Sequence, residues 1–297
     1  MPASAPQWPE PPTGARGRVI FLAGKDPEHE LGAGHSSYVR AHGLAARAAG
    51  YAPQILCLGR QPGVLETAYG TVHRVATRAR PVRQVAIELH ARPLAAAAAA
   101  LAREGDGPAL LHGFGVWSYA GLVAARELRA GGRQVALLVS SYTTYRDEAR
   151  SQLGSSGGAG VAPRVAALGH AALAYGVVAP RERAAYLGAD EVLVNYASVE
   201  RLVRRRFGSR VRVSRCVYGP EAAFGEPSAS ADGAFPSEPA GAPLLLSAGH
   251  HQRRKGNDLL IAALARLKRD GVAVRACLVS GGSLHGAHRR LIGRLGL

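Results

Sequence analysis

A dense group of cations lies between two glycines in the segment "GHHQRRKG", residues 249–256. An apolar strand pattern, Leu244–Ala248, precedes it, and an amphipathic helix pattern begins near Asn257. Cations at a helix N-terminus oppose the helix dipole unless an anion joins them. Ligands of parallel α/β sheets bind beyond the carboxyl ends of the strands. Residues His250, His251, Arg253, Arg254 and Lys255 therefore lie where a ligand would be. The segment predicts an anion site built from Gly249, His250, Arg253, Arg254 and Lys255.

Lys255 is the residue of this group that stands out in composition. The chain has 37 Lys and Arg, yet only Lys25, Lys255 and Lys268 are lysines. A lysine beside a glycine in such a chain suggests that a compact ammonium is needed. The alternative is a solvated basic loop.

Two other glycine turns follow predicted strands. After Val19–Ala23 come Gly32, Gly34, His35 and Ser36, in front of a helix pattern. Glycines let a ligand approach the backbone, and a helix N-terminus binds anions. The alternative is an ordinary loop with a Ser N-cap. The pair Gly281-Gly282 ends a later strand, and an ordinary tight turn is its alternative.

His112 and an arginine-rich segment complete the candidates. His112 ends a predicted strand in "LLHGFGVWSY", which puts it at the ligand edge of a sheet; a hydrogen-bonded core histidine is the alternative. Segment 201–215 holds seven arginines. They predict docking on anionic lipid or nucleic-acid phosphate, or else a solvated helix face.

The elements that position these residues alternate between strand and helix, which is typical of a parallel sheet covered on both faces. The predicted strands are Val19–Ala23, Gln54–Leu58, Thr71–Ala76, Ala109–His112, Val135–Ser140, Glu191–Asn195, Val211–Tyr218, Leu244–Ala248 and Ala273–Ser280. The predicted helices are Ser36–Ala49, Val82–Arg103, Trp117–Ala130, Arg164–Leu187, Ser198–Phe207, Asn257–Lys268 and Leu284–Leu295.

We expect two α/β domains. Residues 1–16 read as a disordered tail, 17–225 as the first domain and 226–243, rich in Pro, Ser, Ala and Gly, as a linker. Residues 244–297 hold two strand–helix units, which is small for a domain that buries its own core. We interpret the second domain as incomplete, either because the chain is a fragment or because the other half comes from elsewhere.

Net charge, cysteine spacing and the distribution of apolar residues limit which ligands and which cell compartment we expect. The net charge of +16 fits phosphorylated ligands, anionic membrane surfaces or nucleic acid. Cys57, Cys216 and Cys277 form no metal or disulfide spacing, which fits a reducing compartment. The first residues lack a signal-peptide pattern, and no long apolar run predicts a membrane span, so we expect a cytoplasmic protein.

Taken in order, these motifs resemble the retaining family-4 glycosyltransferases of the GT-B fold, which have two Rossmann-like parallel-sheet domains. The resembling parts are "GAGHSSYV", "VLVNYASVERLVRRRFG" followed by "VYGPEAAF", "GHHQRRKG" and "VSGGS". Within them the family's pattern falls on Gly34, Val39, Asn195, Gly219, Glu221, Phe224, Gly249, Lys255 and Gly256.

The resemblance implies transfer of a sugar from a nucleotide sugar to an acceptor hydroxyl, with retained configuration. Lys255 and its basic neighbours would bind the donor's diphosphate, and the turn around Gly34 would approach the donor from the first domain. No metal or other cofactor is implied. The first domain would bind the acceptor, a glycan, lipid or small molecule, with Gly154–Arg164 as a flexible loop near it.

This sequence departs from the family in three places. His250 replaces an Arg, and the strand that often ends in a functional His ends in Ser140 and Ser141, leaving His112 as a candidate catalytic residue. The family's paired glutamates would fall beyond Leu297, so we expect the chain as given to be inactive.

Other functions remain open. A sugar-nucleotide epimerase or phosphorylase would share the fold, and a non-catalytic binder of sugar phosphates or of an anionic membrane would need no glutamates. Net charge alone supports nucleic acid, which we do not expect as a partner. A peripheral position at the inner face of the membrane is compatible with the arginines.

Overall fold

A computed structural model describes residues 17–28, 34–76, 87–104, 107–155, 161–216, 242–282 and 284–297. The chain divides into two compact units. The first comprises Met1–Ala149 and Gly169–Gly225, and the second comprises Arg150–Leu168 and Glu226–Leu297. The predicted tail, most of the predicted linker, Gly32, Gly219, Glu221 and Phe224 lie outside the described residues.

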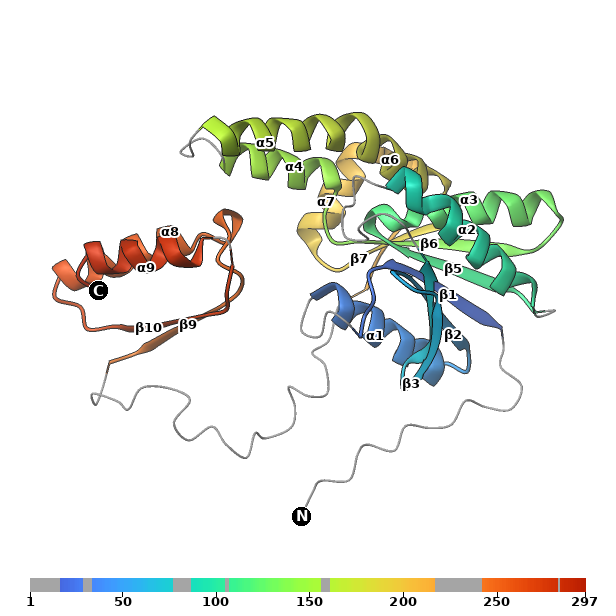
Figure 1. Cartoon of the computed structure of the whole chain (residues 1–297), viewed down its shortest axis with the longest axis horizontal. Helices are drawn as coiled ribbons and strands as arrows, with labels where there is room; N and C mark the ends of the chain where they lie inside the picture. Colours follow the sequence, from blue (N-terminus) through green and yellow to red (C-terminus); the bar gives the residue numbers. More distant parts are fainter. Residues whose placement is uncertain are drawn as a thin grey trace, which may run out of the picture. The chain divides into compact units, whose positions relative to one another are not determined.

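The first unit is built on an eight-stranded sheet (Figure 1), in the order β3-β4-β2-β1-β5-β6-β7-β8. Neighbouring strands are parallel except β3 and β4, which pair antiparallel. Its strands are β1 (Arg18–Gly24), β2 (Ala52–Gly59), β3 (Gly63–Thr67), β4 (Gly70–Ala76), β5 (Ala109–Phe114), β6 (Val135–Ser141), β7 (Glu191–Val194) and β8 (Val213–Arg215). The expected α/β class with a parallel sheet is confirmed.

Helices follow most of these strands along the chain, as the crossover of a parallel pair requires. They are α1 (Gly34–Ala48), α2 (Ile87–Arg103), α3 (Ser118–Ala130), α4 (Tyr145–Ser155), α5 (Val161–Leu173), α6 (Ala179–Gly188) and α7 (Ala197–Phe207). A π-helical segment, Ala174–Val178, joins α5 to α6.

The core of this unit occupies both faces of the sheet, because successive side chains of a strand point to opposite faces. On β1, Ile20 and Leu22 join a cluster that includes residues of α2, α3, α6 and α7. Phe21, between them, joins a second cluster with Val39 of α1. Burial on both faces explains why the central strands are almost continuously apolar.

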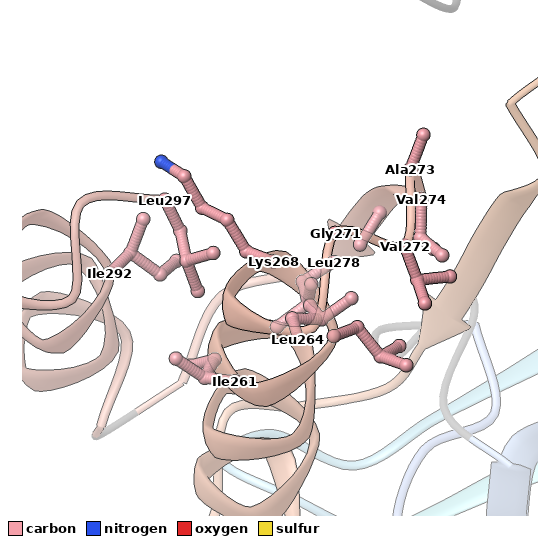
Figure 2. Close-up of a pocket in the computed structure, with 12 residues that line it drawn as sticks. Ile261, Leu264, Lys268, Gly271, Val272, Ala273, Val274, Leu278, Ile292 and Leu297 are labelled. Carbon is pink, nitrogen blue, oxygen red and sulfur yellow. The ribbon is translucent and has the colours of Figure 1, made fainter.

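The second unit contains a parallel pair of strands, β9 (Leu244–Ala248) and β10 (Arg275–Val279), with the helices α8 (Asn257–Arg269) and α9 (His285–Arg294). Leu244, Leu245 and Leu246 remain 37%, 40% and 58% exposed. Apolar side chains of α8, the segment 271–274, β10 and α9 line a pocket of about 500 Å³ (Figure 2). It lies toward the C-terminal end of α8, away from the turn that contains Lys255.

Four local predictions were wrong. Strand β3 was not predicted, and in the described part of the predicted strand Val211–Tyr218, residues 211–216, the strand covers Val213–Arg215. The predicted loop Gly154–Arg164 is helical on both sides of 156–160, which lie outside the described residues. The predicted helix Arg164–Leu187 is interrupted by the π-helical segment.

None of the helices in the described ranges combines the length and the apolar character needed to cross a lipid bilayer.

Candidate functional site

The turn after β9 presents cations at the start of a helix. Arg253–Lys255 form a single 3-10 turn, and Gly256, in the left-handed region at φ 69°, leads into α8. Lys255 and Arg253 are exposed, and neither forms an ion pair with another described residue. Asp258 is the acidic residue in the first turn of α8. The side chain of Arg254 lies outside the described part of the structure.

The turn after β10 lies beside the first turn, because the two parallel strands end at one edge. The Gly249 amide donates to the Val279 carbonyl at 3.1 Å, and the His251 amide to the Gly281 carbonyl at 2.9 Å. Ser280 Oγ lies 3.3 Å from His250 Nδ1. Strained backbone clusters at functional sites, and Ser280 is a non-glycine residue at φ 123°.

The structure therefore brings together the residues predicted from separate segments of the second unit. Gly249, His250 and Gly282 lie at one edge of the sheet, and a Cβ at position 249 would lie 4.0 Å from Lys255 Cδ. Exposed cations, two glycine turns and the N-terminus of α8 can together hold a phosphate group.

Two buried histidines lie behind this edge. The sequence placed His251 among the residues that face a ligand, but its side chain is buried, and His288 was not predicted as part of the site. His251 and His288 are 3% and 4% exposed, and their Nδ1 atoms are 2.9 Å apart. Burial lowers the pKa of His251, and His288 and His285 act in the same direction. The signal was present in the sequence, since His285 and His288 are three residues apart and share one face of a helix.

The glycine turn of the first unit is described only from Gly34, the first residue of α1. The His35 ring is used structurally: its Nε2 lies 2.7 Å from the Ala23 carbonyl, and its edge contacts Phe114. Ser36 is fully buried in the first turn of α1, and its Oγ has no hydrogen-bond partner among the described residues.

His112 lies inside the first unit. It is 3% exposed, and its Nε2 lies 2.8 Å from Ser140 Oγ. Its ring is flanked by Phe114 and His42, at 4.8 and 5.0 Å between centroids. Burial, reinforced by His42, holds its pKa well below the usual value, so the ring is neutral at pH 7. Proton exchange with a ligand would require an opening of this packing.

Two tyrosines that contact the ring neighbours of His112 were also not predicted. Tyr38 and Tyr142 are half-buried, with ring centroids 4.3 Å apart. Asn195, at the end of β7, donates from Nδ2 to the Tyr38 hydroxyl. These residues come from three separated segments, and no spacing in the sequence connects them.

Internal partners neutralise part of the arginine-rich segment. Glu200 pairs with both Arg204 and Arg215, and Arg206 pairs with Asp147 at 3.1 Å. Arg201, Arg205 and Arg212 are exposed and form no ion pair with a described residue.

Within the described ranges, no group of three or more His, Cys, Asp or Glu side chains is arranged to hold a metal ion.

Comparison with known proteins yields no family model that matches the chain and no curated protein that matches its sequence. Solved structures with a similar course of the chain include a sucrose-phosphate synthase from Thermosynechococcus elongatus, at 18% identity and a TM-score of 0.44, covering 69% of this chain and 90% of that one.

Two others are trehalose-phosphate synthases. The enzyme from Burkholderia multivorans is 14% identical, with a TM-score of 0.49, over 95% of this chain and 66% of its own. The UDP-forming enzyme from Burkholderia xenovorans, solved with glucose-6-phosphate, is 13% identical, with a TM-score of 0.49, over 94% and 69%. This chain spans about two thirds of their length. Likenesses this remote identify no family for the chain.

Proposed function

We propose that the chain is part of a glycosyltransferase of the GT-B type, which transfers a sugar from a nucleotide sugar to an acceptor hydroxyl with retained configuration. The observation that carries the proposal is the carboxyl edge of β9 and β10. Exposed Lys255 and Arg253 stand there beside the turns at Gly249 and Gly282.

The chemistry of the reaction explains why such an edge is useful. Cleavage of the sugar–phosphate bond leaves charge on the β-phosphate, and preorganised donors and cations stabilise that charge in the transition state. Lys255 and Arg253 supply full charges, and the first amides of α8 supply partial ones. Arg254 and His250 are the further candidates for the same role.

In the first unit we assign support roles. Gly34 is the first residue of α1, His35 links the first turn of α1 to the Ala23 carbonyl, and Ser36 is buried in that turn. A catalytic role for His112 stays a prediction, and its hydrogen bond with Ser140 favours positioning of β6 against β5. We further propose that the exposed arginines of residues 201–212 dock the protein on an anionic membrane surface.

Lys255→Ala tests the diphosphate site. Uridine and guanosine diphosphate are titrated against the full chain by calorimetry. Loss of a charge-assisted hydrogen bond should weaken binding about 10- to 100-fold, in line with roughly 1.5–3 kcal/mol. Lys268→Ala is the matched control, because it removes the same charge from the last turn of α8, at the end away from Lys255. Equal affinities for both variants would contradict the proposal.

A further inference from the structure

Two buried histidines connect the turn after β9 with helix α9, which follows β10. His251 follows β9 and His288 lies in α9, 37 residues later. Their Nδ1 atoms are 2.9 Å apart, and both side chains are buried. This side-chain contact ties the turn that leads to Lys255 to the helix that follows β10.

The backbone of His251 is held on the same side. Its amide donates to the Gly281 carbonyl at 2.9 Å, and its carbonyl accepts from the Leu284 amide at 2.9 Å. Gly282 packs so closely that a Cβ there would lie 2.6 Å from the His251 nitrogen. The position of residues 249–256 therefore depends on the seating of His251.

The number of protons that His251 and His288 carry together decides whether their hydrogen bond can form. A hydrogen bond between two Nδ1 atoms needs a proton on one of them and a lone pair on the other. A neutral pair and a pair with one extra proton both satisfy this. With two extra protons, both Nδ1 atoms are donors and two like charges face each other in a buried site, so the contact breaks.

The surroundings contain no described carboxylate that affects His251 electrostatically, since its charged influences are His288 and His285. Burial lowers the pKa of His251, and the nearby Leu278 backbone acts in the opposite direction. The other titratable or charged groups on the packed elements are His250, Arg253, Arg254 and Lys255 in the turn, Asp258, Arg266, Lys268 and Arg269 in α8, Arg275 and Cys277 in β10, and His285, Arg289, Arg290 and Arg294 in α9.

We propose that His251 and His288 are positioning residues that hold the turn leading to Lys255 in its anion-binding form, and that the second protonation of the pair releases this turn. This inference rests on the proposed function only for the identity of the anion. The seating of the turn is a property of the ligand-free protein.

The direction in which anion affinity changes with pH distinguishes release of the turn from direct binding of the phosphate by a histidine. If His250 or His285 bound the phosphate as a cation, affinity would rise as the pH falls. Release of the turn lowers affinity as the pH falls below about 6.5, the ordinary pKa of histidine. The ligand's own phosphate protonation affects every variant equally, so differences between variants isolate the pair.

The first test is hydrogen exchange of the ligand-free full chain at pH 5.5 and 7.5. His288→Asn keeps a hydrogen-bonding group close to the Nδ1 position but cannot be protonated. At pH 5.5, amides of residues 249–256 should exchange about tenfold faster in the wild type than in His288→Asn, and the two should agree at pH 7.5. His170→Asn, in the first unit, is the control and should follow the wild type. If these amides exchange at the same rate in the wild type and in His288→Asn at both pH values, the proposal is overturned.

A second measurement remains decisive if His288→Asn does not fold. Proton NMR of the wild type follows the two imidazoles and the amides of residues 249–256 in one titration. The turn should lose protection with the second protonation of the pair. Protection that persists when both rings are charged overturns the proposal.

Binding of uridine diphosphate then tests the role of the histidine pair separately from the proposed donor site. Affinity at pH 5.5 should be about tenfold lower for the wild type than for His288→Asn. If uridine diphosphate binds with Lys255 dependence but without this difference, the role of the pair is rejected. If it does not bind at all while the exchange difference is present, the proposed donor fails and the histidine pair stands.

Discussion

Gly282 is packed directly against the backbone of His251. Its φ is 148°, and a Cβ at this position would meet the nitrogen, carbonyl oxygen and carbonyl carbon of His251 at 2.6–3.0 Å. Backbone atoms cannot yield as the end of a flexible side chain can. Its neighbour Gly281 has nothing within 4 Å of its Cβ position. The two adjacent glycines therefore differ in what they contribute to the turn.

Gly282→Ala should destabilise the second unit by about 1–3 kcal/mol, through overpacking and backbone strain. It should also weaken binding of uridine diphosphate by separating the two strand-end turns. Gly281→Ala is the matched control and should behave as the wild type. Chemical denaturation followed by circular dichroism, together with calorimetry, provides the measurement. Equal effects of the two substitutions would show that the close contact is unimportant.

The sequence predicted the exposed residues of the anion site, but it did not predict the contact between its buried histidines. Lys255 is visible in the sequence because lysine is rare in this chain, and the glycine turns are visible because glycine marks a turn after a strand. His251 and His288 pair across 37 residues. Such a contact depends on how α9 packs on the turn, which no local spacing determines.

Helix α4 is anchored at its N-terminal end by a buried carboxyl group from α6. Both carboxyl oxygens of Glu182 lie 3.0 Å from the Tyr145 amide, at the first residue of α4. Glu182 is 4% exposed. Burial raises its pKa to about 8, although the Tyr145 amide and Arg206 act in the opposite direction.

Stability should therefore fall as the pH rises. A carboxyl group whose pKa is higher in the folded than in the unfolded state binds its proton more tightly when folded. Its contribution is complete below the unfolded value near 4.5 and is lost as the pH approaches 8. Between pH 5 and 8 the unfolding free energy should decrease by on the order of 3–5 kcal/mol relative to Glu182→Gln.

Urea denaturation at several pH values measures this difference. Glu127→Gln, which changes an exposed carboxylate paired with Arg103, should parallel the wild type. A Glu182→Gln variant with the same pH profile as the wild type would contradict the assignment of the titrating group.

At the level of elements, periodicity predicted the central strands and most helices because both faces of the sheet are covered. The failures have physical causes. Strand β3 pairs only with β4 at the sheet edge and is largely exposed, so it carries no buried apolar run. Helix α4 begins with capping groups, Thr144 and Asp147, but continues into "SQLGS", whose composition suggests a loop.

The whole molecule is strongly cationic, with a net charge of +16. Within residues 201–215, Arg204 and Arg215 pair with Glu200, and Arg206 pairs with Asp147. Arg201, Arg205 and Arg212 are exposed and form no ion pair with a described residue, and the exposed Arg210 donates from Nε to the Phe207 carbonyl at 3.4 Å. The sequence shows that residues 201–215 contain seven arginines, but it does not show which of them form ion pairs with acidic residues of the same chain.

Cosedimentation with lipid vesicles tests whether these three arginines dock on a membrane. Each arginine near an anionic surface contributes about 1 kcal/mol, so replacing all three with Gln should weaken binding to vesicles containing phosphatidylglycerol at least tenfold. Replacing the exposed Arg60, Arg92 and Arg126 with Gln changes the net charge equally and should have a much smaller effect. Equal losses would mean that binding follows net charge alone. Equal binding to neutral and anionic vesicles would exclude electrostatic docking, because neutral lipid offers the arginines no counter-charge.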